Sequence, residues 1–226
     1  MKLKATLMTV LLAALPAFTF SGAKNEWKNL FDGKTLNGWT KKGGGATYSV
    51  VDGTIVGTTG DGPNTFLCTE QQFGDFELEF DVKLNNPFNS GVQIRSNEKK
   101  IEKKAKKKKK ASVSLRVNGP QVEIENSPGE SGYIYGEATG LGWLTPKDKL
   151  IKHSKFKNGE WNHFRVVAKG ARIQTWINGE PVADLVHEGI YKTHPKGFIG
   201  LQVHGTKGGA EKKWTVQWKN IRIREL

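Results

Sequence analysis

The feature that most constrains the fold of this chain is a strict alternation of apolar and polar residues in short stretches. Three of them read SGVQIR at 90–95, QVEIE at 121–125 and IGLQVH at 199–204. Successive side chains of a β-strand point to opposite faces, so a period of two separates buried residues from presented ones. We therefore expect three strands whose apolar residues enter a core. If the strands share one sheet, an arginine, a carboxylate and a histidine line one polar concavity.

The polar positions of these stretches are the first candidates for a functional site. They are Gln93, Arg95, Gln121, Glu123, Gln202 and His204. A half-solvated antiparallel sheet with ordinary surface residues produces the same alternation, so periodicity alone leaves that interpretation open.

Strand patterns dominate the rest of the chain. Residues 76–84 alternate over nine positions, and Asp52-Gly53 and Asn178-Gly179 are strong signals for hairpin turns. Many short strands separated by turns favour a β-sandwich or jelly roll over parallel βαβ units. We predict an all-β fold made of a single sandwich.

The first residues resemble a secretory signal peptide. A basic start precedes an apolar run and small residues at Ser21 and Ala23. We expect residues 1–23 to be removed and residues 24–226 to form one exported domain, periplasmic or secreted, with no transmembrane segment. Cys68 is the sole cysteine, so an internal disulfide is excluded, and its apolar neighbours predict a buried thiol.

Much of the formal net charge of +13 comes from one segment. Residues 98–110 hold nine lysines against Glu98 and Glu102. Blocks of like charge stay solvated, so we predict an exposed insertion in the form of a loop or a frayed helix. The segment could contact an anionic surface. It lacks the interleaved aromatic residues of nucleic-acid binders, so we expect no nucleic-acid partner.

Local motifs for common cofactors and metals are absent. The five histidines are dispersed, and the chain shows no zinc spacing and no calcium loop, although a structural calcium would suit a sandwich. We therefore predict no cofactor and no metal. Trp143 lies in a glycine-bounded segment at 140–146 and could stack on a sugar or anchor the loop.

The order of several blocks resembles the 3-keto-disaccharide hydrolase family. The blocks are WKNLFDGKTLNGW at 27–39, FGDFE at 73–77, NSGVQIR at 89–95, GEWN at 159–162, NG at 178–179, GLQVHG at 200–205 and NIRIR at 220–224. This resemblance implies a concanavalin A-like jelly roll of two curved antiparallel sheets, with a carbohydrate site on the concave face. It assigns Asn89, Arg95 and His204 to that site. The chain departs from the family in carrying Gln121 before Glu123, the reverse of the usual order, and Asn126 where an aspartate is usual.

The resemblance implies cleavage of a glycosidic bond in a sugar with a ketone at carbon 3. On this hypothesis Glu123 and His204 are base and acid in either order, and Arg95 stabilises an enolate. The predicted substrate-binding residues are Asn89, Gln93, Gln121, Gln202 and Trp143. A separate enzyme would oxidise the sugar. A non-catalytic carbohydrate-binding module is the alternative, and ordinary hydrolysis would need Glu125 as a second carboxylate.

Overall fold

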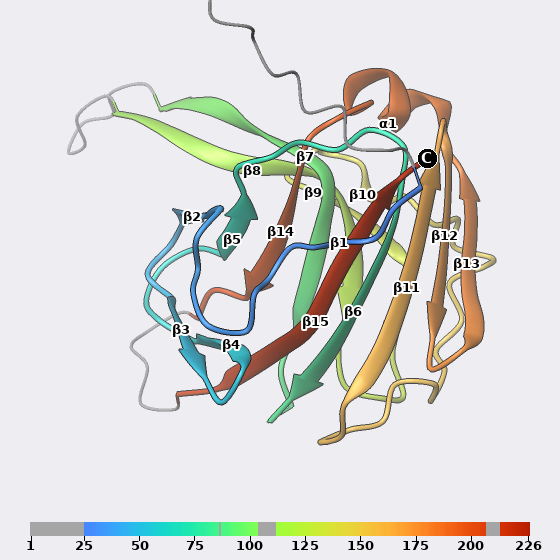
Figure 1. The fold of residues 1–226 in the computed structure, drawn as a ribbon. Coiled ribbons are helices and arrows are strands. Elements are labelled where there is room, and N and C mark those ends of the chain that lie inside the picture. Colours follow the sequence, from blue (N-terminus) through green and yellow to red (C-terminus); the bar gives the residue numbers. More distant parts are fainter. Residues whose placement is uncertain (1–24, 86, 104–111, 207–212) are drawn as a thin grey trace, which may run out of the picture.

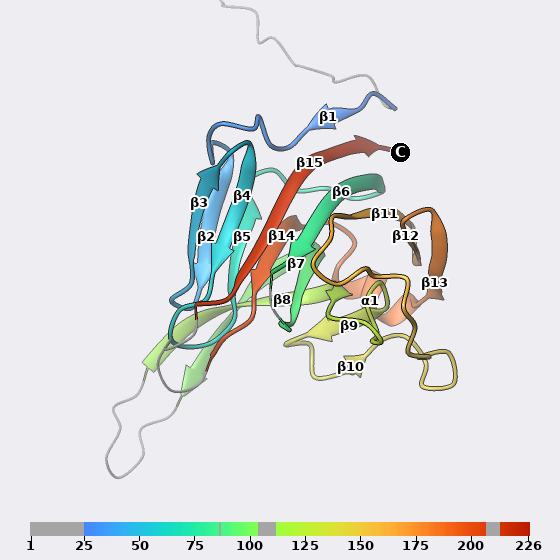
Figure 2. The same cartoon turned by 90° about the horizontal axis from the view of Figure 1, so that it is seen from below.

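The computed structural model describes residues 25–85, 87–103, 112–206 and 213–226, and it folds them into a sandwich of two antiparallel sheets (Figures 1 and 2). One sheet has eight strands in the order β13-β12-β11-β6-β15-β4-β3, with β1 paired to β15, and the other has seven in the order β10-β9-β8-β7-β14-β5-β2. The all-β sandwich predicted from the sequence is confirmed.

The eight-stranded sheet consists of β1 (Lys28–Asn29), β3 (Thr47–Val51), β4 (Thr54–Thr58), β6 (Phe76–Leu84), β11 (Asn162–Lys169), β12 (Arg172–Ile177), β13 (Glu180–Val186) and β15 (Thr215–Glu225). The seven-stranded sheet consists of β2 (Trp39–Gly43), β5 (Thr65–Thr69), β7 (Ser90–Lys103), β8 (Ser112–Ile124), β9 (Ile134–Glu137), β10 (Gly142–Trp143) and β14 (Phe198–Val203). A short helix, α1 (Glu188–Thr193), precedes β14.

The core lies between the sheets because each strand keeps its period of two. In β6 the apolar residues Phe76, Leu78 and Phe80 are fully buried, and the polar residues between them face outward. The two predicted hairpin turns are confirmed. Asp52 joins β3 to β4 with φ of 47°, and Asn178 joins β12 to β13 with φ of 53°.

A β-bulge interrupts the pairing of β7 with β8. Gln93 pairs with Gln121 and Asn97 pairs with Asn118, so β7 carries one residue more than β8 between these pairs. Arg95 lies in the bulge with φ of 47°. An extra residue exchanges the two faces of a strand, so side-chain parity does not carry past Gln93.

Beyond the bulge, β7 and β8 form a two-stranded arm made of residues 97–103 and 112–118 in the described part of the chain. Glu98 to Lys103 are extended and paired, so the frayed-helix prediction is wrong for these residues. The remainder of the predicted insertion, like the predicted signal peptide, lies outside the described residues.

The arm folds back over the seven-stranded sheet (Figure 1). Two strands separate β7 from β2, a span of about 14 Å at the usual strand spacing. The Lys42 amine on β2 nevertheless lies 2.7 Å from the Glu98 carboxylate on the arm. Val117 of the arm packs with Phe66, Cys68 and Phe198 of the sheet. Cys68 is fully buried, as predicted, and burial raises the pKa of its thiol.

Candidate functional site

The polar face of the seven-stranded sheet gathers the glutamines predicted from the sequence. Gln93 is directly opposite Gln121 on the neighbouring strand. Gly91 is opposite both Glu123 and Gln202, on the strands at either side of it. Because directly opposed residues of antiparallel strands project to the same face, these four side chains share one face. Their exposed fractions lie between 0 and 5%.

Hydrogen bonds join these side chains into one network. The amide nitrogens of Gln93 and Gln202 both donate to Oε1 of Gln121, at 2.6 and 2.8 Å. Nε2 of Gln121 donates to Oε2 of Glu123 at 3.0 Å, and Nδ2 of Asn89 donates to Oε1 of Glu123. The network therefore ends at Asn89, the residue that precedes β7.

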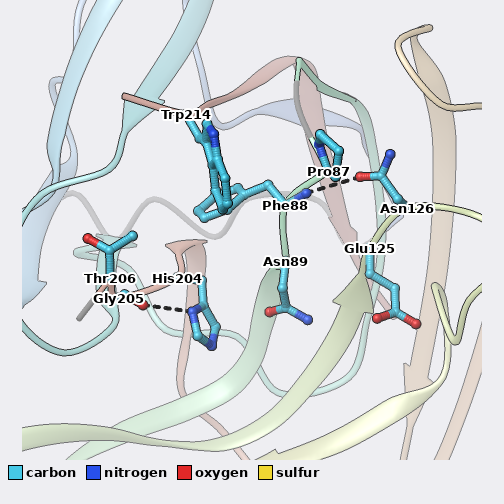
Figure 3. A pocket seen from close by; sticks show the side chains of 9 residues that line it. All are labelled: Pro87, Phe88, Asn89, Glu125, Asn126, His204, Gly205, Thr206 and Trp214. Atoms are coloured by element: carbon cyan, nitrogen blue, oxygen red, sulfur yellow. Dashed lines mark hydrogen bonds between the residues drawn. The ribbon is translucent and has the colours of Figure 1, made fainter. Parts of the chain in front are cut away.

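An open pocket of about 340 Å³ lies at this end of the sheet (Figure 3). Asn89 precedes β7, Glu125 follows β8 and His204 follows β14. Because these three strands are adjacent and antiparallel, the three residues lie at the same end of the strands. In Figure 3 Asn89 stands between His204 and Glu125, and the aromatic residues form the opposite wall. The lining residues are Pro87, Phe88, Asn89, Glu125, Asn126, His204, Gly205, Thr206 and Trp214.

His204 is exposed, and one hydrogen bond orients its imidazole ring. Nδ1 lies 2.9 Å from the carbonyl oxygen of Gly205, which can only accept. Nδ1 therefore carries the proton in the neutral ring, and Nε2 keeps a free lone pair. His204 can act as a base through Nε2.

Two carboxyl groups near the pocket have pKa values that are raised to near neutral pH. Burial raises the pKa of Glu123 to about 7, against the hydrogen bonds from Gln121 and Asn89, which lower it. Burial is the main cause that raises the pKa of Glu125 to about 7, and the neighbouring Glu130 is the second cause. A carboxyl group with such a pKa can give or accept a proton at neutral pH. Glu125 lines the pocket, whereas Glu123 is buried and contacts Asn89.

Arg95 does not join this group, contrary to the sequence prediction. Because it sits in the bulge of β7, its side chain leaves the polar face and is 1% exposed. Its guanidinium donates to the carbonyl oxygens of Gly74 and Gly170, both at 2.6 Å, and to Asp75 at 2.8 Å. Arg95 thus ties three chain segments together, and every nitrogen of its guanidinium has a protein partner.

Trp143 also lies away from the pocket. It belongs to the edge strand β10 and packs edge-to-face on Tyr135 at 5.4 Å. The tryptophan that lines the pocket is Trp214, whose ring packs against Phe88 at 5.6 Å.

Sequence reasoning had no local signal for Trp214, because it lies far along the chain from the polar stretches. Glu125 carried a signal, since it shares the parity of Gln121 and Glu123 on β8. Asn126, which stands where the family usually has an aspartate, is a pocket residue that accepts a hydrogen bond from the Phe88 backbone at 3.1 Å.

The described part of the chain contains no cluster of three or more His, Cys, Asp or Glu side chains that could hold a metal ion. Across the same residues, no helix combines the length and the apolar character that a membrane span requires.

Two solved structures share the β-sandwich fold of this chain. A predicted glycosyl hydrolase from Parabacteroides distasonis is 24% identical, covers 89% of this chain and all of its own, and superposes with a TM-score of 0.58. The carbohydrate-binding module CBM66 from Bacillus subtilis is 16% identical, with 83% of this chain and 96% of its own covered and a TM-score of 0.58.

The chain belongs to the 3-keto-alpha-glucoside-1,2-lyase-like domain family, whose pattern matches residues 26–224. The 3-keto-disaccharide hydrolase of Bacteroides thetaiotaomicron is 22% identical over 87% of this chain and 77% of its own length. The family resemblance seen in the sequence is confirmed.

Proposed function

We propose that this protein cleaves the glycosidic bond of 3-keto-glycosides by elimination followed by hydration. The observation that carries the proposal is the placement of His204 and Glu125 on either side of Asn89 in one open pocket (Figure 3). Membership of the 3-keto-alpha-glucoside-1,2-lyase-like family supports this choice of reaction.

The reaction uses the acidity that a ketone gives to its neighbouring carbon. A base removes the proton from carbon 2, and its electron pair forms an enolate with the ketone at carbon 3. The enolate then forms a double bond between carbons 1 and 2 and expels the substituent on carbon 1, whose oxygen takes a proton from an acid. Water adds back across the double bond, with its hydroxyl on carbon 1 and its hydrogen on carbon 2.

The pocket offers one group for each proton transfer. Nε2 of His204 takes the proton from carbon 2, since its lone pair is free when Nδ1 bonds to Gly205. Glu125 in its protonated form gives a proton to the leaving oxygen, and its raised pKa keeps that form populated near pH 7. Arg95 has no part in this scheme, because its partners hold it elsewhere.

The aromatic wall gives the sugar a surface to lie on. Trp214 and Phe88 line the pocket opposite the polar residues, and an indole face packs well on the C–H face of a pyranose. This assignment moves the stacking role from Trp143 to Trp214. We further propose that the protein acts outside the cytoplasm and receives its 3-keto substrate from a separate sugar-oxidising enzyme.

The test is release of the aglycone from a 3-keto-glucoside by purified protein. We expect Glu125→Gln and His204→Ala each to lower kcat/KM by at least about 100-fold, the usual scale for acid–base residues. Glu79→Gln and His163→Ala are matched controls, because both residues lie on the eight-stranded sheet and outside the pocket. The controls should keep wild-type turnover.

Two outcomes would overturn the proposal. If the wild type binds sugars but releases no aglycone from any 3-keto substrate, the protein is a binding module that uses the same pocket. If it cleaves unoxidised glycosides equally fast, the ketone has no role and conventional hydrolysis explains the activity.

A further inference from the structure

We propose that Glu123 is a positioning residue that turns the amide of Asn89 so that its carbonyl oxygen faces the sugar. This inference rests on the proposed function only in taking a sugar as the ligand of the pocket. It gives Glu123 a different task from the acid–base role predicted from the sequence.

The contacts of Glu123 argue against direct chemistry. The side chain is buried, with 5% of the residue exposed, and it is not a lining residue of the pocket. Oε1 accepts a hydrogen bond from Asn89 and Oε2 accepts one from Gln121. Each carboxylate oxygen therefore already has a protein donor.

The hydrogen-bond network fixes the direction of these contacts. The hydroxyl of Ser96 donates to Oε1 of Gln93 at 2.6 Å, and the nitrogen of Gln93 donates to Gln121. Gln121 thus accepts through its oxygen and presents its nitrogen to Glu123. In its ionised form Glu123 receives one N–H on each oxygen and accepts only the nitrogen end of Asn89.

The orientation of Asn89 determines what the pocket offers a ligand. Nδ2 is held by Glu123, and Oδ1 has no hydrogen-bond partner among the described residues; Figure 3 shows Oδ1 on the side of His204. An amide oxygen accepts hydrogen bonds and cannot donate one. The floor of the pocket therefore recognises a hydroxyl donor of the sugar beside the imidazole. A site that pairs with a substrate hydroxyl rejects the analogue that lacks it, because its own polar group is then left unpaired.

The experiment compares 3-keto-glucosides that lack single hydroxyl groups. We expect the wild type to discriminate strongly against one of the 2-deoxy, 4-deoxy and 6-deoxy substrates. In Glu123→Gln, the new amide nitrogen faces the amide nitrogen of Asn89, and two donors repel each other. The Asn89 amide therefore rotates so that its oxygen faces residue 123, and discrimination against the deoxy substrate should fall at least about 10-fold. Asn89→Ala should lose the same discrimination while leaving the glutamines and Glu123 in place.

A charge swap and a control separate positioning from folding. In Asn89→Asp combined with Glu123→Gln, the carboxylate introduced at position 89 can accept from the amide introduced at position 123, and an oxygen again faces the pocket. We expect the swap to recover discrimination relative to Glu123→Gln alone. Glu137→Gln is the matched control, since Glu137 is equally buried on the same sheet but contacts Asn64 and Arg116 instead. The control should keep wild-type discrimination.

Binding of the corresponding unoxidised glucosides, measured by calorimetry, keeps this test independent of turnover. If the wild type turns over no 3-keto substrate, the proposed reaction fails, yet the loss of hydroxyl discrimination in Glu123→Gln still tests the positioning role. If Glu123→Gln folds normally and slows all substrates by one common factor, Glu123 takes part in proton transfer and the inference is wrong.

Discussion

A buried glutamate on one sheet of the sandwich has arginine partners, whereas a buried glutamate on the other sheet has only amide partners. On the outer face of the eight-stranded sheet, Glu77 accepts hydrogen bonds from Arg165 and Arg224, at 2.5 and 2.7 Å for the two Nε donors. On the polar face of the seven-stranded sheet, Glu123 receives only amide donors. Burial alone would raise the pKa of Glu77, but the two arginines outweigh it and the pKa is lowered. Burial raises the pKa of Glu123 to about 7.

An alternating strand pattern therefore does not say what its polar residues do. Glutamates alternate with apolar residues in both regions: Glu77 and Glu79 lie in β6, and Glu123 lies in β8 with Glu125 directly after that strand. The cations on neighbouring strands decide whether a carboxylate becomes part of a stabilising ladder or stays able to exchange protons at neutral pH. The candidate pocket lies at the sheet where Glu123 and Glu125 have no arginine partner among the described residues.

The largest effect on stability should come from Arg95. Arg95→Ala leaves the carbonyl oxygens of Gly74 and Gly170 without this donor, whereas Asp75 keeps the backbone N–H of Gly170 as a donor; each unsatisfied buried acceptor costs about 1–3 kcal/mol. Urea unfolding measures the change. Arg222→Ala removes the partly exposed ion pair with Glu79 on the eight-stranded sheet and should cost at most about 1 kcal/mol. Equal losses in the two variants would show that the bulge of β7 does not depend on Arg95.

Glu123 should make stability fall as the pH rises. Its pKa is higher in the folded protein than in the unfolded chain, so the folded state holds the proton more tightly. The stabilisation is complete below about pH 4.5 and is lost as the pH rises towards 7 and above, on the order of 3 kcal/mol at most. Unfolding free energies at pH 5 and pH 8 should differ less in Glu123→Gln than in the wild type. An unchanged difference would show that Glu123 ionises freely in the fold.

Glu77 should give the opposite pH dependence. Its pKa is lowered in the fold, so its contribution is present at neutral pH and is lost as the pH falls through the folded-state pKa. Glu77→Gln should destabilise the protein by about 1.5–3 kcal/mol at pH 7, the usual range for hydrogen bonds to a charged group, and by less at pH 3. A loss that is the same at both pH values would mean that the arginines gain little from the charge.

The smallest effect should come from the ion pair that holds the arm. Lys42 and Glu98 are both partly exposed, so a double-mutant cycle with Lys42→Met and Glu98→Gln should give a coupling of about 0.2–1 kcal/mol. The apolar contacts of Val117 should hold the arm without this pair. Coupling well above this range would mark the ion pair as the main attachment of the arm.

Much of the fold could be predicted from the sequence because a period of two is a direct consequence of strand geometry. The sandwich, both hairpins and the shared face of Gln93, Gln121, Glu123 and Gln202 follow from it. Arg95 was misplaced because parity fails after a bulge, and residues 94–96 include no glycine that would mark this one.

The pocket itself was harder to predict, because it is made by long-range contacts. Trp214 and Phe88 meet across more than a hundred residues of sequence, and only the folded chain brings them to Asn89. The strand period already marked His204, whereas Asn89 was found through the family resemblance. Nothing in the sequence distinguished Glu123, which is buried, from Glu125, which lines the pocket.

Gly91 carries a consequence for how this protein can vary through evolution. It lies opposite Glu123 and Gln202, and a β-carbon there would stand 2.5 Å from Cδ of Gln121. Any larger residue at 91 would displace Gln121 and break the network that ends at Asn89. Among relatives, we therefore expect positions 91 and 121 to change together or not at all. A residue without a side chain thus restricts the mutational paths open to a pocket that it does not line.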